Sequence, residues 1–131
     1  MSSDALPAFE LGYPRTELRR QLVEAVLRGE KTATAGLAEE FERDGESLPR
    51  VGDRYVLHDV DDVPVAVVEI TDARVCPVRE IDVRFARDEG EGFESVDDWR
   101  EAHAAFFARP IDDETLIVAQ RFRVVKTLPG S

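Results

Sequence analysis

Hydrophobic residues recur at helical spacing between Thr16 and Arg28 and predict an amphipathic helix there. Thr16 is a typical N-cap residue, and Gly29 stands where a left-handed residue would end the helix. The apolar stripe of this helix consists of Leu18, Leu22 and Val26, with Val23 and Leu27 beside it.

Helical spacing returns twice in the second half of the chain. One pattern joins Val78, Ile81 and Phe85. The other runs from Val96 to Phe107, after a Ser95 and Asp98 pair with the spacing of a capping box, and it ends before Pro110. The apolar stripe of this last helix contains Val96, Trp99, His103, Phe106 and Phe107. A short helix is also expected from Leu37 to Phe41.

Three segments have the pattern of β-strands, namely Arg54 to Val60, Pro64 to Val75 and Leu116 to Val125. Asp61 and Asp62 form a turn that joins the first two into a hairpin. The order helix, strands, helices, strand predicts an α+β fold, a small mixed β-barrel or strongly curved sheet with helices over its openings. Residues 1–14 are expected to form an N-terminal arm and residues 15–131 a single domain.

Composition limits the partners of this chain. Its 131 residues carry a net charge of −11, with a sequence pI near 4.6, which disfavours charge-driven binding of long nucleic acids such as duplex DNA. No stretch has the pattern of a signal peptide or a membrane span, so we expect a cytoplasmic protein with no membrane partner. The single cysteine, Cys76, is expected to be a small buried residue near a strand end. No cofactor is predicted, and metal dependence and oligomeric state are left open.

The segment from Gly29 to Thr34 has the clearest chemical potential. Lys31 and the hydroxyls of Thr32 and Thr34 directly follow the helix end, where they would converge on an anion or a carbonyl group. The alternative is an ordinary surface lysine. If the backbone is extended, Thr32 and Thr34 share a face and Lys31 lies on the other, so only a turn would bring Lys31 to Thr34.

Other groups offer weaker signals. In Glu89-Gly90-Glu91-Gly92 the glycines would allow a tight turn that brings a carboxylate to a ligand, although a flexible acidic linker is the favoured interpretation. His103 is expected to be a packed, hydrogen-bonded histidine, since His58 is the only other histidine and neither has a metal-ligand spacing. Arg121 and Arg123 share one face of the last strand, where they bind phosphate or merely cover the sheet.

The segment from Leu22 to Thr34 resembles the signature of the ASCH domain family. That signature is, in order, a glycine, any residue, a lysine, any two residues, and a threonine or serine. The similarity extends roughly from Leu18 to Val125. It includes Gly52-Asp53 before a strand, the hairpin through Pro64 to Ile70, Phe85-Ala86 before Glu89 to Gly92, and then Trp99, His103 and Phe107. This resemblance implies a PUA-like mixed β-barrel flanked by helices beside a cleft, a fold related to RNA-binding modules.

Members of this family are linked to ribonuclease activity and to amide hydrolysis of acetylated cytidine. The resemblance implies a catalytic set of Lys31, Thr34 and Glu89, with Glu91 as a rival to Glu89. In amide cleavage, Thr34 would be the nucleophile, Lys31 would remove its proton or polarise the carbonyl, and Glu89 would pass a proton to the amine. The expected ligand-binding residues are Gly29, Thr32, Glu91, Arg121 and Arg123.

The expected function is therefore hydrolysis of RNA or of a nucleoside-like small molecule. In phosphodiester cleavage, Lys31 with Arg121 or Arg123 would stabilise the anionic transition state and a carboxylate would act as base. Two alternatives remain: a non-catalytic RNA-binding or regulatory module, and a domain whose cleft binds an unrelated metabolite.

Overall fold

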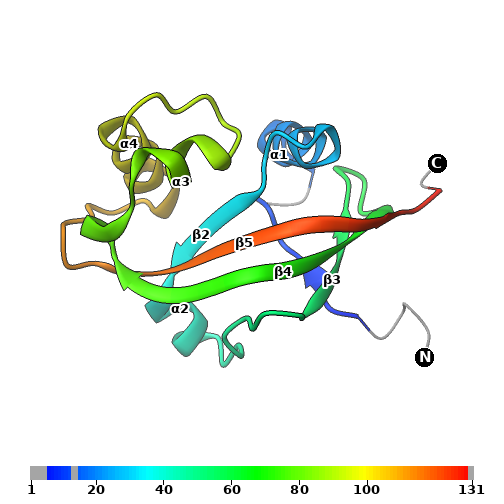
Figure 1. Ribbon diagram of the computed structural model, residues 1–131, viewed down its shortest axis with the longest axis horizontal. Helices are drawn as coiled ribbons and strands as arrows, with labels where there is room; N and C mark the ends of the chain where they lie inside the picture. The colour runs from blue at the N-terminus through cyan, green and yellow to red at the C-terminus, as the bar shows by residue number, and fades with distance from the viewer. Residues whose placement is uncertain (1–5, 13–14, 130–131) are drawn as a thin grey trace.

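The computed structural model describes residues 6–12 and 15–129, which form an α+β fold built on one curled five-stranded sheet (Figure 1). The strand order is β1-β3-β4-β5-β2; β1 pairs with β3 in parallel, and the other pairs are antiparallel. Register shifts near Val67 and Ile70 interrupt the ladder of β4 with β5, and such irregularities bend a strand. The strands are β1 (Ala8–Phe9), β2 (Ala33–Leu37), β3 (Arg54–His58), β4 (Pro64–Pro77) and β5 (Leu116–Thr127).

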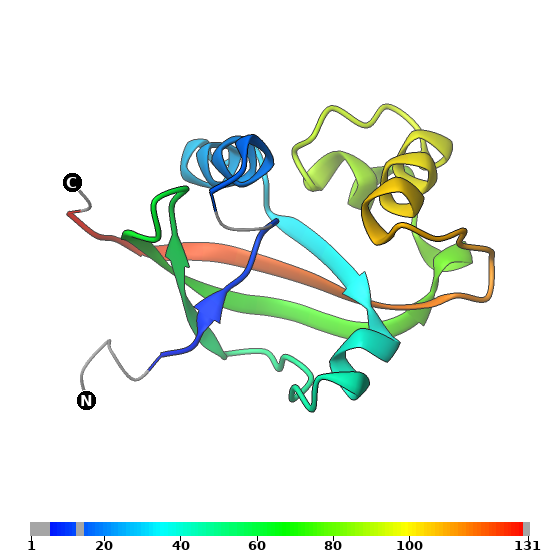
Figure 2. The same cartoon turned by 180° about the vertical axis from the view of Figure 1, so that it is seen from behind.

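The helices gather mainly along one side of this sheet. Figures 1 and 2 both show α1 beside one end of the long strands, α3 and α4 beside the other end, and α2 on the opposite side. The helices are α1 (Glu17–Arg28), α2 (Ala38–Arg43), α3 (Val83–Asp88) and α4 (Val96–Phe107), with a 3-10 turn, η2, at Val78–Glu80. The connection from α1 to β2 passes between the two groups of helices.

The capping signals of the two longest helices are confirmed. The hydroxyl of Thr16 accepts a hydrogen bond from the Arg19 amide at 3.1 Å, and Gly29 ends α1 in the left-handed region with φ of 82°. Ser95 begins α4 by accepting from the Asp98 amide at 3.0 Å. Local side-chain chemistry therefore sets where these helices begin.

Two segments differ from the prediction. The helix expected through Val78, Ile81 and Phe85 is broken into η2 and α3, because Asp82 caps a new helix by accepting from the Phe85 amide at 2.8 Å. Residues Ala33–Leu37 form β2, a strand that was not predicted, so Leu37 ends a strand and α2 follows it. Pairing with β5 stabilises this segment, which is poor in β-formers.

The N-terminal arm contributes to the core. β1 adds a parallel strand beside β3, and Phe9 and Leu11 are buried. Phe9 and Leu11 therefore attach the arm to the core, whereas its residues 1–5 and 13–14 lie outside the described part of the chain.

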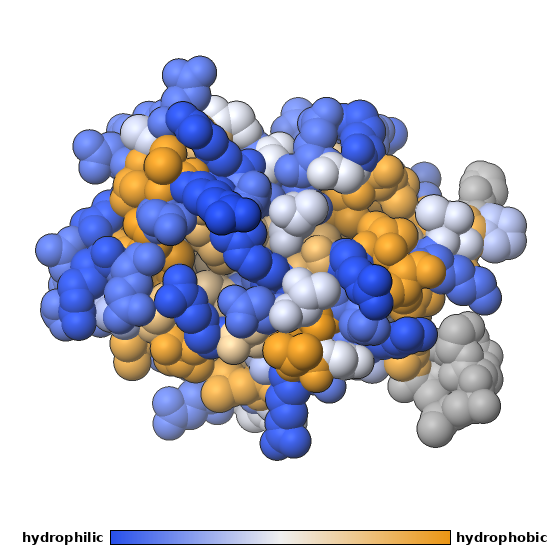
Figure 3. Space-filling view, in the orientation of Figure 1, coloured by the Kyte–Doolittle hydropathy of each residue, from blue (hydrophilic) through white to orange (hydrophobic). Residues whose placement is uncertain are grey.

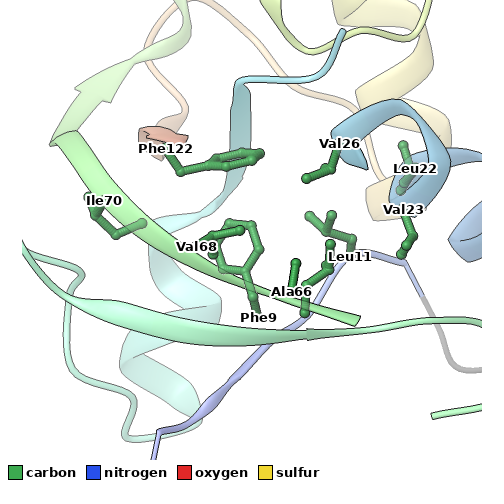
Figure 4. Close-up of a cluster of buried hydrophobic side chains, with 10 residues drawn as sticks. Phe9, Leu11, Leu22, Val23, Val26, Ala66, Val68, Ile70 and Phe122 are labelled. Carbon is green, nitrogen blue, oxygen red and sulfur yellow. The ribbon is translucent and has the colours of Figure 1, made fainter. Parts of the chain in front are cut away.

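Two hydrophobic clusters stabilise the fold. Phe122 of β5 belongs to the first, which includes residues of α1, whereas Ile117 and Ala119 belong to the second, which includes residues of α3 and α4. Figure 4 shows the first cluster, which consists of Phe9, Leu11, Leu22, Val23, Val26, Leu57, Ala66, Val68, Ile70 and Phe122. The second consists of Ala33, Leu37, Cys76, Val78, Ile81, Phe85, Ala86, Trp99, Ile117 and Ala119.

The surface of the face drawn in Figure 3 mixes hydrophilic side chains with apolar ones. None of the helices in the described part of the chain has both the length and the apolar character that crossing a membrane requires.

Candidate functional site

The backbone from Gly29 to Thr32 connects α1, α3 and the sheet. The amides of Glu30 and Lys31 both donate to the Ala25 carbonyl, at 2.9 and 3.1 Å. The Thr32 amide donates to the carbonyl of Asp88 at 2.7 Å, and its carbonyl accepts from the Phe122 amide at 3.1 Å. This segment is therefore fixed on both sides before it continues into β2.

The side chain of Lys31 is buried, and the residue is only 2% exposed. Its ammonium donates to the carbonyls of Ala33 at 2.9 Å and Glu89 at 3.1 Å. It also lies 3.4 Å from one carboxylate oxygen of Glu89 and 3.4 Å from one of Glu91. Buried lysines require such partners, because an unpaired charge away from water is costly. The surface-lysine alternative is thus excluded.

Glu89, which is 1% exposed, is the other centre of the cluster. It lies at the C-terminal end of α3, and its oxygen Oε1 contacts Lys31. Its second oxygen, Oε2, accepts a hydrogen bond from the indole N–H of Trp99 and lies 3.2 Å from Nε2 of His103. Both carboxylate oxygens are therefore held by donors: Lys31 lies in the connection before β2, and Trp99 and His103 both lie on α4.

His103 lies beside Glu89 and is buried among aromatic rings. It stacks on Trp99, one turn earlier in α4, with ring centroids 4.0 Å apart and planes 19° apart. Its Nδ1 lies 2.8 Å from the Trp99 carbonyl oxygen. The rings of Phe93 and Phe107 approach it at 5.8 and 5.7 Å.

The neighbouring charges determine the ionisation of this pair. Burial alone raises the pKa of Glu89, but the hydrogen bond from His103 and the positive charge of Lys31 outweigh it, so the carboxyl pKa is lowered. Burial alone lowers the pKa of His103, but its hydrogen bond to Glu89 and the negative charge of that carboxylate outweigh it, so the imidazole pKa is raised. Glu89 is therefore a carboxylate in this site.

Gly90 packs directly on the lysine segment. A Cβ at this position would lie 2.6 Å from the Glu30 carbonyl oxygen and 2.7 Å from the Lys31 Cα, and the φ of Gly90 is +70°. Only glycine fits both the space and this backbone conformation. Glu89 and Gly90 are thus packed, which contradicts the flexible-linker interpretation for the first half of the segment, whereas Gly92 is exposed and has no atom within 4 Å of an added Cβ.

Glu91 lies between Lys31 and the molecular surface. Its side chain is 26% exposed, it contacts the Lys31 ammonium, and it lines a pocket of about 250 Å³. A second pocket, of about 280 Å³, is lined by residues of the Gly29–Thr32 segment itself. The first is lined by Leu18, Gln21, Leu22, Ala25, Arg28, Gly90 and Glu91; the second includes Arg28, Gly29, Lys31, Thr32, Phe122 and Arg123.

The structure brings only some of the predicted residues together. Lys31, Glu89 and Glu91 form one cluster, and Gly29 and Thr32 line the second pocket with Arg123. Thr34 is part of β2, where it pairs with Gln120. Because Ala33 points into the cluster under α3 and α4, the side chain of Thr34 points to the opposite face.

The two arginines of β5 are already paired. Arg121 donates to Asp88 at 2.6 Å and lies 5.3 Å over the ring of Phe85, while Arg123 donates to Glu69 at 3.3 Å. Neither interaction includes Lys31.

Sequence reasoning missed the polar role of Trp99 and underestimated His103. His103 is a packed, hydrogen-bonded histidine as predicted, but its partners are Glu89 and its own helix. The available signal was the spacing of four residues between Trp99 and His103 on one helix face, which is also the spacing of ordinary core residues. Only the position of Glu89 shows that these two side chains bind a carboxylate as well as pack in the core.

A model of the ASCH domain family matches residues 10–126, nearly the whole chain. The chain belongs to the ASCH domain family. Membership supports a PUA-like RNA-binding domain, in agreement with the fold described above. A search of curated proteins found no match.

Solved structures agree with this assignment. An ASCH domain from Lactobacillus crispatus is 33% identical, with a TM-score of 0.70 over 80% of this chain and 70% of that one. A protein from Enterococcus faecalis is 26% identical, with a TM-score of 0.79 over 92% and 77% of the two chains. A third, hypothetical protein, 18% identical with a TM-score of 0.53 over 79% and 90%, shares the fold alone.

Proposed function

We propose that this ASCH domain is a hydrolase acting on RNA or on a nucleoside-like small molecule, with Lys31 and Glu89 as its acid–base centre. The observation that supports this most is the buried contact of 3.4 Å between the Lys31 ammonium and the Glu89 carboxylate. Apolar residues in place of a buried ion pair are often at least as stabilising, so stability alone does not explain the presence of such a pair. Buried charges with shifted pKa values are also more common at functional sites.

The chemistry requires a polarising group and a proton carrier. For an amide substrate, the Lys31 ammonium would hydrogen-bond the carbonyl oxygen while Glu89 takes a proton from the attacking water. The water oxygen bonds to the carbonyl carbon, the C–N bond breaks, and the proton on Glu89 passes to the departing amine. For a phosphodiester, Lys31 would stabilise the phosphoryl oxygens while Glu89 accepts the proton of the nucleophile. The nucleophile oxygen bonds to phosphorus, the P–O bond to the leaving oxygen breaks, and the proton on Glu89 passes to that oxygen.

Glu91 defines the route by which a substrate would reach Lys31. The N–H groups of the Lys31 ammonium are already occupied. Of the two carboxylates that contact this ammonium, Glu91 is the one that also lines the pocket of about 250 Å³. A substrate oxygen would therefore take the place of the Glu91 carboxylate beside Lys31. Arg28 would supply a second positive charge at the pocket wall.

Thr34 remains a candidate nucleophile only through the family resemblance. Its position on the opposite face of β2 from Ala33 favours a water molecule as nucleophile beside Lys31 and Glu89. The water-based reaction is the version that we propose.

A non-catalytic RNA-binding module is the second candidate. The near-complete burial of Lys31 and Glu89 favours it, because a catalytic group must reach its substrate. In that case the two pockets would hold a base and a phosphate without turnover.

Turnover assays separate the two candidates. Acetylated cytidines, simple amides and short single-stranded RNAs would be incubated with the wild type, Lys31→Met and Glu89→Gln, after circular dichroism has verified that each protein is folded. Lys126→Met is the matched control, because Lys126 is exposed. We expect both site variants to lose on the order of 10²- to 10⁴-fold in turnover. Equal turnover by wild type and Glu89→Gln, or binding of RNA without any turnover, would contradict the hydrolase.

A further inference from the structure

The hydrogen bonds of His103 fix the number of protons that it shares with Glu89. The Trp99 carbonyl can only accept, so Nδ1 of His103, 2.8 Å away, must carry a proton. The other ring nitrogen, Nε2, lies 3.2 Å from the Glu89 carboxylate oxygen. Two bare acceptors would repel each other at this distance, so one proton must lie between Nε2 and Glu89.

The surrounding charges place that proton on the imidazole. The Lys31 ammonium and the Trp99 indole N–H also point at the Glu89 carboxylate, and both interactions favour its ionised form. The charges that surround His103 are Glu89, at the end of α3, and Glu91, in the loop that follows. With His103 protonated, the cluster contains two cations, Lys31 and His103, and two carboxylates, so its charges balance.

We infer that His103 is a positioning residue of this site, doubly protonated at neutral pH, that holds Glu89 as a carboxylate facing Lys31. The inference about protonation depends only on the contacts above. The expected effect of His103 on turnover rests on the proposed function, in which Glu89 carries the proton and His103 acts through Glu89. A Glu89 held beside an imidazolium would also return a proton more readily to a leaving group.

The packing of His103 explains how this charge persists in a buried place. Trp99 stacks on one face of the imidazole, and Phe93 and Phe107 lie at its edges. These rings exclude water, which by itself disfavours the charged imidazole but strengthens its ion pair with Glu89, and the ion pair outweighs the cost of burial. The stacked Trp99 ring also orients the imidazole, so that Nε2 points at the carboxylate.

The test is a nitrogen-15 NMR titration of the histidine side chains, which distinguishes the imidazolium from either neutral tautomer. The protein has two histidines, and His58→Gln assigns the second signal. We expect both His103 nitrogens to be protonated at pH 7, with a titration midpoint above the ordinary value of about 6.5. In Glu89→Gln the midpoint should fall. A neutral ring at pH 7 in the wild type would overturn the inference, and this measurement requires no variant of the site.

A second measurement separates the inference from the proposed function. If a substrate is found, His103→Gln should move the acidic limb of the pH–rate profile to higher pH, because Glu89 loses the charge that lowers its pKa. An acidic limb that stays in place would show that His103 does not act through Glu89. If no substrate is turned over, the hydrolase proposal fails, while the NMR titration still decides whether His103 is charged.

Discussion

The Lys31 ammonium lies 3.4 Å from the Glu89 carboxylate, although 58 residues separate the two in the sequence. Lys31 follows the first helix, whereas Glu89 ends α3, and the Thr32 amide joins the two segments by donating to Asp88. The two charges therefore meet only because α1, β2 and α3 pack together around this connection.

The first prediction concerns the stability of this ion pair. Lys31→Met removes the cation and leaves Glu89 buried without it, which should lower the free energy of unfolding by about 3–5 kcal/mol. The double variant with Glu89→Gln should lose less than the sum of the single variants, because neither charge then remains unpaired. Urea denaturation of the four proteins measures this coupling. Additive losses would show that the two side chains do not interact energetically.

The second prediction is a pH dependence of stability from His103. Its pKa is raised in the folded protein, so its contribution is complete below the unfolded value of about 6.5 and is lost as pH rises through the folded pKa. As pH rises from about 6.5 through the folded pKa of His103, the wild type should therefore lose stability relative to His103→Gln. Urea midpoints at several pH values measure the difference. His58→Gln is the control and should follow the wild type.

The third prediction concerns the contact of Gly90 with the lysine segment. Gly90→Ala would place a methyl group 2.6 Å from the Glu30 carbonyl oxygen in a left-handed conformation, so we expect a loss of about 2–5 kcal/mol. Gly92→Ala is the matched control, because Gly92 has a φ of +84° but no atom within 4 Å of its added Cβ. Its loss should be about 1 kcal/mol, from backbone strain alone. Similar losses in thermal denaturation for both variants would contradict the close packing of Gly90.

The fourth prediction concerns Glu91 as the group that a ligand displaces. Glu91→Gln removes a carboxylate that competes for Lys31, so short single-stranded RNA should bind on the order of threefold to tenfold more tightly. Glu94→Gln, an exposed residue of the same loop, removes the same charge from the protein and should change affinity less. Fluorescence anisotropy at fixed salt provides the comparison. Equal effects of both variants would indicate a general charge effect and no competition at Lys31.

The fifth prediction separates Thr34 from the acid–base centre. Because its side chain lies on the opposite face of β2 from Ala33, Thr34→Val should retain most of any turnover that Lys31→Met and Glu89→Gln abolish. Valine has a similar shape and suits a strand, so folding should be preserved. A loss as large as that of Lys31→Met would restore Thr34 as the nucleophile.

Several features of the fold follow from local sequence signals. The Thr16 cap and Gly29 bound α1, and Ser95 begins α4, because these residues satisfy helix-end hydrogen bonds with atoms close in the chain. The break at Asp82 also has a local cause, but the apolar spacing of Val78, Ile81 and Phe85 fits a continuous helix equally well. The family signature around Lys31 correctly indicated the ASCH domain.

The sequence by itself determined the boundaries of the main helices, the strongest strands and the family, since these depend on short-range spacing and on a motif. Tertiary structure decided that Ala33–Leu37 is a strand, because its hydrogen bonds come from β5. It also decided that Lys31, Glu89 and His103 form one buried cluster. Residues so distant in the chain meet only when the helices pack, and no local pattern records which charges will then neutralise one another.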